Sequence, residues 1–126
     1  MLIDTHCHLD DERYDENIEQ VLENAKRKGV EKFIIPGADP KTLQKAVDLA
    51  EMYENVYFSV GVHPYDACHY DKIYLEHFVT HPKCVAIGEC GLDYFRLPES
   101  EEEVEKEKKL QKEVFIDQIL WAKEMH

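Results

Sequence analysis

The sequence predicts an α/β fold in which four βα units form a parallel sheet. Short apolar stretches rich in β-branched residues alternate with segments of helical periodicity, an order typical of parallel strands joined by right-handed crossovers. Each expected strand is closed by one of the residues His8, Gly37, His63 and Glu89, at intervals of 29, 26 and 26 residues, a repeat that fits one strand, turn and helix. A complete (β/α)8 TIM barrel needs about 250 residues. We therefore expect residues 1–126 to form a single partial domain, the N-terminal half of such a barrel.

Composition restricts the class of protein. The 15 Lys and Arg residues against 27 Asp and Glu give a formal net charge of -12, which argues against broad nonspecific binding to a polyanion. A nucleic-acid substrate would have to be attracted by metal ions and a local patch. The cysteines, at positions 7, 68, 84 and 90, show no CxxC spacing, and no apolar run approaches the roughly 18 residues of a membrane span. We expect a cytoplasmic protein with reduced thiols and no membrane contact.

The first expected strand begins with the apolar residues 1–3 and extends to His8. Side chains alternate along extended backbone, so Asp4, His6 and His8 should share one face, and Cys7 should be a small buried residue on the opposite face. Two imidazoles beside a carboxylate can form part of a metal site. The alternative is a polar strand end with two solvated histidines.

The elements after His8 follow from apolar periodicity and from turn residues. The expected strands cover residues 30–35, 56–62 and 85–88. The first expected helix has apolar residues Ile18, Val21, Leu22 and Ala25 and ends at Gly29, and the second runs from the N-cap Asp39 to about Asn55. A short third helix is expected around 74–79. The last expected helix has Leu110, Val114, Gln118 and Trp121 on its apolar face. Residues 90–98 are expected to be a loop. The acidic run 99–103 should be the solvated start of the last helix, because carboxylates complement a helix dipole there.

Three polar residues are expected to meet at one edge of the sheet. The carboxyl ends of parallel strands gather at the same edge, where ligands bind, and His8, His63 and Glu89 each follow a strand. The period of the hydrophobic pattern alone predicts this meeting, whatever the identity of the histidines. Each residue also has a simpler interpretation, because His63 before Pro64 could only close a strand and Glu89 could be a solvated loop carboxylate.

Three motifs occur in order along the chain. They are Ile3-Asp4-Thr5-His6-Cys7-His8, Gly61-Val62-His63-Pro64 and Ile87-Gly88-Glu89-Cys90-Gly91-Leu92-Asp93-Tyr94. With them the chain resembles the TatD family of metal-dependent deoxyribonucleases, within the amidohydrolase-like TIM-barrel superfamily. The segment 111–115, followed by Gln118, resembles that family's fourth helix. The resemblance spans the whole chain but only the N-terminal half of the family domain.

The resemblance implies a cofactor, a reaction and roles for five residues. It implies two divalent cations, Mg, Mn or Zn, with His6, His8 and Glu89 as ligands, and a water activated by them that cleaves DNA phosphodiester bonds. It makes Glu89 and His63 catalytic and places His63 and Asp93 beside the substrate. It also places two further histidines and an aspartate, the expected proton acceptor, on strands beyond residue 126. We therefore expect weak metal binding and little turnover from residues 1–126 alone.

Two other functions stay open. One is an inactive or partner-dependent half-barrel. The resemblance implies a monomeric full family domain, whereas the exposed edges of the first and fourth strands predict that a half-barrel associates with another copy. The other is a metal-dependent hydrolase of small amides or esters, as found elsewhere in the superfamily.

Overall fold

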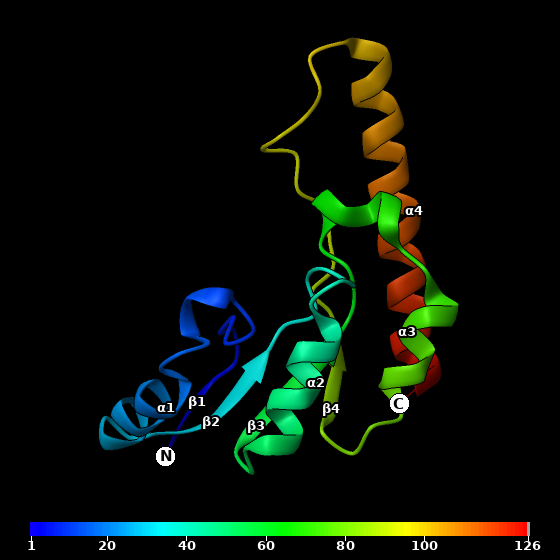
Figure 1. Cartoon of the computed structure of the whole chain (residues 1–126). Helices are drawn as coiled ribbons and strands as arrows, with labels where there is room; N and C mark the ends of the chain where they lie inside the picture. The colour runs from blue at the N-terminus through cyan, green and yellow to red at the C-terminus, as the bar shows by residue number, and fades with distance from the viewer. Residues whose placement is uncertain (126) are drawn as a thin grey trace.

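The protein forms a four-stranded parallel sheet in the order β1-β2-β3-β4, with helices packed against it (Figure 1). The structure is a computed structural model, and it describes residues 1–125. The strands are β1 (Leu2–Asp4), β2 (Val30–Ile35), β3 (Val56–Val60) and β4 (Cys84–Ile87). The helices are α1 (Ile18–Arg27), α2 (Leu43–Met52), α3 (Lys72–Val79) and α4 (Glu101–Met125), with short 3-10 helices η1 (Glu12–Tyr14) and η2 (Pro64–His69). The predicted parallel α/β arrangement is confirmed.

β3 is buried, β2 is buried only in part, and the outer strands are mostly exposed. Phe58 and Val60 of β3 are fully buried, whereas Leu2 of β1 is 59% exposed and Val85 of β4 is 49% exposed. This difference follows from the strand order, because β1 and β4 each pair on one side only. The predicted open edges at the first and fourth strands are therefore present in the structure.

The first strand ends earlier than the sequence predicts. β1 stops at Asp4 and not at His8, because Asp4 Oδ1 accepts the backbone N–H of His6 at 3.1 Å and turns the chain. Asp4 is exposed. Cys7 is half-buried, and its backbone N–H and its thiol both donate to the Ile34 carbonyl, at 3.2 and 3.4 Å. The two histidines thus lie on a loop that is tied to β2.

Later boundaries also differ. α2 begins at Leu43 and not at Asp39, because Asp39 Oδ1 accepts the N–H of Lys41 and closes a separate turn before the helix. β3 ends at Val60 and not at Val62, whose backbone N–H and carbonyl bond to a side chain of α4. Elsewhere the predicted elements are present with small differences at their ends, since α2 ends at Met52 and not near Asn55 and β4 covers 84–87 and not 85–88. β2 covers the expected residues, and α1 is closed at Gly29, which adopts the left-handed conformation (φ +89°) that favours glycine.

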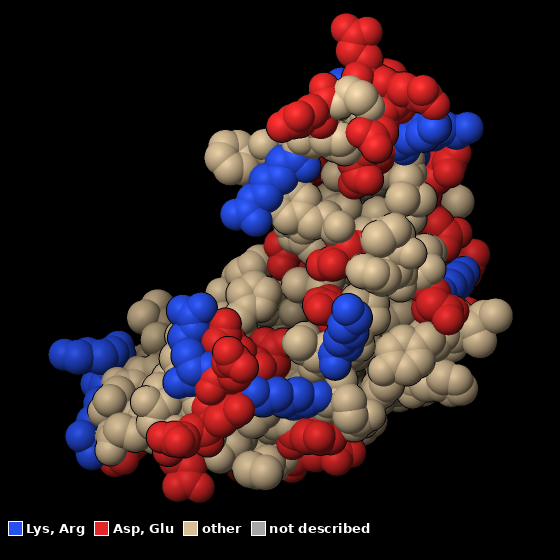
Figure 2. Space-filling view, turned by 45° about the horizontal axis from the view of Figure 1, so that its top comes forward, with Lys and Arg blue, Asp and Glu red and all other residues tan. Residues whose placement is uncertain are grey.

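α4 is the longest helix, and its first half projects beyond the sheet (Figure 1). Ser100 caps its start, because Ser100 Oγ accepts the N–H of Glu103 and donates to the carboxylate of Glu103 at 2.8 Å. Figure 2 shows acidic side chains gathered at this projecting end, as predicted for a solvated helix start. The buried face includes Val114 and Trp121. Within residues 1–125 the helices are too short or too polar to span a membrane.

The cysteines, which are all free, differ in reactivity through burial. Burial, with the nearby Asp4 charge, raises the pKa of Cys7 to about 12, and burial raises the pKa of Cys84 above its ordinary value. Because the thiolate is the reactive form, we expect iodoacetamide at pH 8 to modify the exposed Cys68 before Cys7 and Cys84. Timed alkylation in EDTA, read out by peptide mass spectrometry, measures the order. Equal rates at Cys7 and Cys68 would contradict the burial seen here.

Candidate metal centre

The predicted metal ligands meet at the carboxyl ends of the strands. His6 and His8 follow β1, Glu89 follows β4, and the nearest ligand atoms of the three side chains lie within 4.8 Å of one another. His6 Nε2 is 3.6 Å and His8 Nε2 is 4.0 Å from the same oxygen, Glu89 Oε2. In a flat sheet, strands β1 and β4 would be about 14 Å apart, three strand spacings. The cluster therefore depends on curvature of the sheet.

Backbone contacts between the tips of β2 and β4 fix the position of Glu89. The Glu89 N–H donates to the Gly37 carbonyl at 2.7 Å, and the Gly37 N–H donates to the Gly88 carbonyl at 3.2 Å. The peptide bond that joins Gly88 to Glu89 is cis. A Cβ on Gly61, between these tips, would lie 2.5 Å from the carbonyl carbon of Gly88, so only glycine permits this approach.

Asp10 lies behind the cluster and was not among the predicted site residues. Its side chain is buried, and its Oδ1 atom, which lies 3.8 Å from His8 Nδ1, has no hydrogen-bond partner within the described residues. A metal-ligating histidine commonly donates its other ring N–H to a carboxylate, which leaves one nitrogen for the metal. The available signal was that Asp10 continues the spacing of Asp4, His6 and His8, but that spacing does not reveal burial.

The donor set fits a divalent cation. Two imidazole nitrogens and a carboxylate oxygen are ligands that zinc and other divalent metals accept, and the buried Asp10 supplies the partner that His8 would need. The side chains of His6 and His8 are 57% and 44% exposed, and that of Glu89 is 25% exposed. The cluster is therefore open on one side, as in catalytic metal sites that leave a position for water or substrate.

His63 and Asp93 lie beside the cluster. His63 Nε2 is 3.8 Å from Glu89 Oε1 and 3.9 Å from Asp93 Oδ2. His63 Nδ1 accepts the backbone N–H of Tyr65 at 3.1 Å, which places the ring proton of the neutral imidazole on Nε2. Hydrogen bonds from the Phe95 N–H and the Tyr65 hydroxyl lower the pKa of Asp93 and keep it ionised at neutral pH. The structure thus brings all five predicted site residues to one edge of the sheet.

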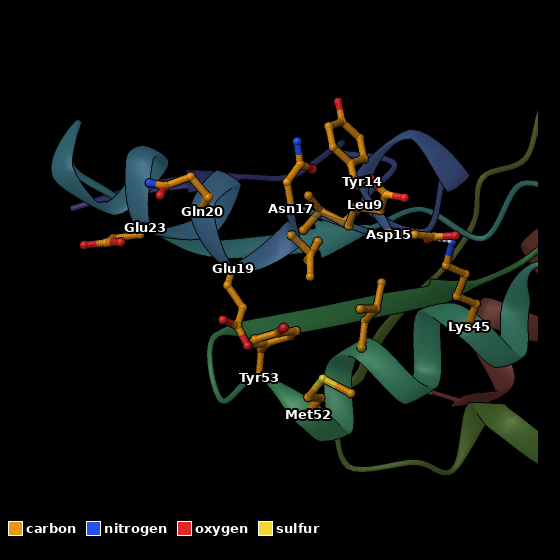
Figure 3. Close-up of a pocket in the computed structure, with 13 residues that line it drawn as sticks. Leu9, Tyr14, Asp15, Asn17, Glu19, Gln20, Glu23, Lys45, Met52 and Tyr53 are labelled. Atoms are coloured by element: carbon orange, nitrogen blue, oxygen red, sulfur yellow. Dashed lines mark hydrogen bonds and ion pairs between the residues drawn. The ribbon is translucent and has the colours of Figure 1, made fainter.

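A separate groove lies between α1 and α2 (Figure 3). Leu9, Tyr14 and Tyr53 line it, and an ion pair between Lys45 and Asp15 lies at one end. Its lining residues include none of the clustered histidines and neither Glu89 nor Asp93. The chemistry at the strand ends therefore does not extend into this groove.

Comparison with known proteins decides the family. The sequence model of the family described as TatD related DNase matches residues 3–126. The chain belongs to the TatD family. It is 40% identical over 131 residues to the uncharacterized metal-dependent hydrolase YabD of Bacillus subtilis, covering 100% of this chain and 48% of that protein. It is 36% identical over 108 residues to the 3'-5' ssDNA/RNA exonuclease TatD of Pectobacterium carotovorum, covering 80% of this chain and 42% of that protein.

A solved structure of a TatD homologue has the same fold. The crystal structure of YjjV from Escherichia coli matches with a TM-score of 0.81 and 29% identity, over 98% of this chain and 47% of that one. The predicted half-barrel and the predicted resemblance to TatD proteins are both confirmed. This TatD-family chain spans about half the length of the relatives it matches.

In this TatD-family chain, two glutamines of α4 hydrogen-bond the backbone at the site. One bonds Val62, which precedes His63, and the other bonds Asp93 itself. Gln118 accepts the N–H of Val62 at 2.9 Å through Oε1 and donates to the Val62 carbonyl at 3.3 Å through Nε2. Gln111 makes the same pair with the N–H and the carbonyl of Asp93, both at 3.0 Å. The two glutamines are seven residues apart and therefore lie on one face of the helix. This pairing explains why a polar residue occupies the buried face of α4.

We expect Gln118→Leu to lower the free energy of unfolding by about 1–3 kcal/mol, because it leaves the buried Val62 N–H and carbonyl without partners. Denaturant unfolding followed by circular dichroism measures the loss. The matched control is Lys112→Leu, an exposed position on the same helix, which should change stability by less than about 0.5 kcal/mol. Equal stability of Gln118→Leu and the unmodified chain would show that the amide pairing is unimportant.

Proposed function

We propose that this TatD-family protein is a metal-dependent hydrolase that cleaves DNA phosphodiester bonds with two divalent cations, Mg, Mn or Zn. The observation that carries the proposal is the convergence of His6 Nε2 and His8 Nε2 on one oxygen of Glu89, with His63 Nε2 facing the other oxygen. One oxygen of Glu89 faces His6 and His8 and the other faces His63, so this carboxylate would hold a cation together with the two histidines. The exonuclease name carried by the Pectobacterium relative supports a nucleic-acid substrate.

The chain's own residues would hold the cations and orient their ligands. His6, His8 and Glu89 would bind, and Asp10 would accept the Nδ1–H of His8 and keep Nε2 directed at the cluster. When bound, the cations would polarise the phosphodiester and lower the pKa of a water, so that the water attacks at neutral pH.

His63 would stabilise the charge that builds on the phosphate. Its Nε2 carries the ring proton, because Nδ1 accepts the Tyr65 N–H, and can donate to a nonbridging oxygen. Such a bond contributes about 2.7–4 kcal/mol if it strengthens only in the transition state. The ionised Asp93, 3.9 Å from Nε2, would orient this ring and bound substrate.

Metal-dependent hydrolysis tests the proposed function. The protein is incubated with single-stranded DNA or bis(p-nitrophenyl) phosphate in Mg²⁺, Mn²⁺ or Zn²⁺, with EDTA as the metal-free control. We expect slow hydrolysis that requires metal and disappears in Glu89→Gln. A cyclic amide, dihydrouracil, serves as the competing substrate class. Turnover of the amide without turnover of either phosphodiester would favour an amidohydrolase over a nuclease. No turnover of any substrate with any metal would contradict both hypotheses.

A second candidate function is a half-barrel that works only in association with another copy. The exposed apolar residues at the sheet edges favour it, with Leu2 and Ile3 of β1 at 59% and 46% and Val85 of β4 at 49% exposure. Light scattering measures the mass of the chain in solution. A concentration-dependent increase in mass supports association, and a monodisperse monomer contradicts it.

We also propose a cytoplasmic location, because the four cysteines are free and a reducing compartment keeps thiols in this form. Fractionation of cells that express the protein tests it. Recovery in the cytoplasmic fraction is expected, and recovery from an oxidising compartment or from the medium would contradict the proposal.

A further inference from the structure

The loop after β4 carries exposed aromatic side chains next to the metal centre. This loop, residues 88–100, and the start of α4 project beyond the carboxyl ends of the strands (Figure 1). Phe95 is 87% exposed and Tyr94 is 43% exposed. Such exposure is unfavourable in water, because covering apolar surface lowers the free energy of the system. The two rings are therefore candidates for contact with a ligand.

Two cations accompany the aromatic rings. The Arg96 guanidinium lies 5.5 Å from the centre of the Tyr65 ring, and Lys108 Nζ lies 5.5 Å from the centre of the Tyr94 ring. Lys108 Nζ also lies 3.8 Å from Glu105 Oε1, so the positive charge at this place rests mainly on Arg96, in a chain of net charge -12. The acidic residues 99–103 lie farther along, at the projecting end (Figure 2). The surface that could accept phosphate is therefore short and ends before that acidic run.

Hydrogen bonds join the aromatic loop to the metal centre. Asp93 Oδ1 accepts the N–H of Phe95 at 3.0 Å, and Gln111 of α4 holds both backbone groups of Asp93. Asp93 Oδ2 is 3.9 Å from His63 Nε2, which in turn faces Glu89. A phosphate held at His63 would thus have the aromatic loop as its neighbour.

We propose that Phe95 and Tyr94, with Arg96 and Lys108, form a platform on which the bases of a single-stranded nucleic acid stack. The position of the phosphate rests on the proposed function, whereas the platform itself rests on exposure and charge. Base–aromatic stacking tolerates any base, and cationic side chains beside the rings bind the backbone. The short cationic surface limits the contact to the one or two nucleotides next to the cleaved bond.

Binding without divalent metal tests the platform separately from catalysis. Fluorescence anisotropy in EDTA compares labelled octathymidylate with an abasic octamer of the same charge. Phe95→Ala should weaken octathymidylate binding by about 5-fold or more, as expected for loss of one stacked base, and should leave abasic binding unchanged. Ile73→Ala, which removes an apolar side chain of α3 that is 76% exposed, is the matched control and should change neither.

A tryptophan reporter gives a second readout. In Phe95→Trp, octathymidylate should quench the fluorescence of the new ring while the abasic strand does not, and the native Trp121 is buried at 2% exposure and should contribute little change. No detectable octathymidylate binding, equal losses for both strands, or dissociation of an oligomer on Phe95→Ala would each overturn the platform. If Phe95→Ala still binds octathymidylate as tightly as the unmodified protein while metal-dependent hydrolysis of phosphodiesters is observed, the platform is overturned and the proposed function is not. Absence of hydrolysis with every metal counts against the proposed function alone.

Discussion

Glu89→Gln is expected to lower the affinity for Mn²⁺ or Zn²⁺ by more than about 100-fold, since loss of an outer partner of a ligand already costs about 10- to 100-fold. Glu89 supplies the oxygen on which both Nε2 atoms converge, at 3.6 and 4.0 Å. The amide has nearly the same volume, so the backbone bonds that Glu89 makes with Gly37 should survive. Isothermal titration calorimetry of metal-free protein measures the affinity.

Two further variants rank the contributions around Glu89. Asp10→Asn removes the buried charge behind His8 and should weaken binding by about 10- to 100-fold. Glu99→Gln neutralises an exposed carboxylate of the neighbouring loop and serves as the control, with no change expected. Equal, small losses in all three variants would mean that the acidic surface attracts cations without a defined site.

Gly61→Ala is expected to disturb the metal centre through the backbone alone. The added Cβ would lie 2.5 Å from the carbonyl carbon of Gly88, and neither backbone can rotate away as a side chain could. Overpacking of this kind costs about 1–3 kcal/mol, and the accompanying shift of Gly88 should move Glu89 away from His6 and His8. Unfolding in denaturant and metal titration measure the two effects.

A different glycine separates loss of stability from displacement of Glu89. Gly29→Ala places a side chain at φ +89°, where a left-handed conformation costs about 1–2 kcal/mol, but its Cβ meets no atom within 4 Å. It should therefore destabilise the protein without weakening metal binding. If both variants weaken binding equally, the contact between Gly61 and Gly88 does not position Glu89.

The sequence predicts the sheet and the edge where the site lies because both depend on periodicity. Alternating apolar stretches indicate parallel strands, and such strands place the residues after them at one edge, where His63 and Glu89 are found. Periodicity does not locate the end of a strand. Asp4 caps the His6 N–H and ends β1 early, and this local bond competes with the sheet without changing the pattern of apolar residues.

The missed features depend on contacts that are distant in sequence. In the sequence Gly37 looks like an ordinary turn residue and Gly61 lies inside the expected strand 56–62. Only the folded chain shows that the tips of β2 and β4 approach closely there. The same limit applies to Asp10, whose burial behind His8 depends on the path of the loop. It also applies to Gln118, because a glutamine on an apolar stripe has no visible partner until Val62, in the segment after β3, is placed beside α4.

The central claim is that His6, His8 and Glu89 form a metal site. Anomalous diffraction from crystals of the protein grown with Mn²⁺ or Zn²⁺ tests it most directly. The account predicts an anomalous peak within coordination distance of His6 Nε2, His8 Nε2 and Glu89, about 2.0–2.2 Å for nitrogen and oxygen ligands of zinc. Full metal occupancy elsewhere on the protein, with no peak among these three side chains, would contradict it.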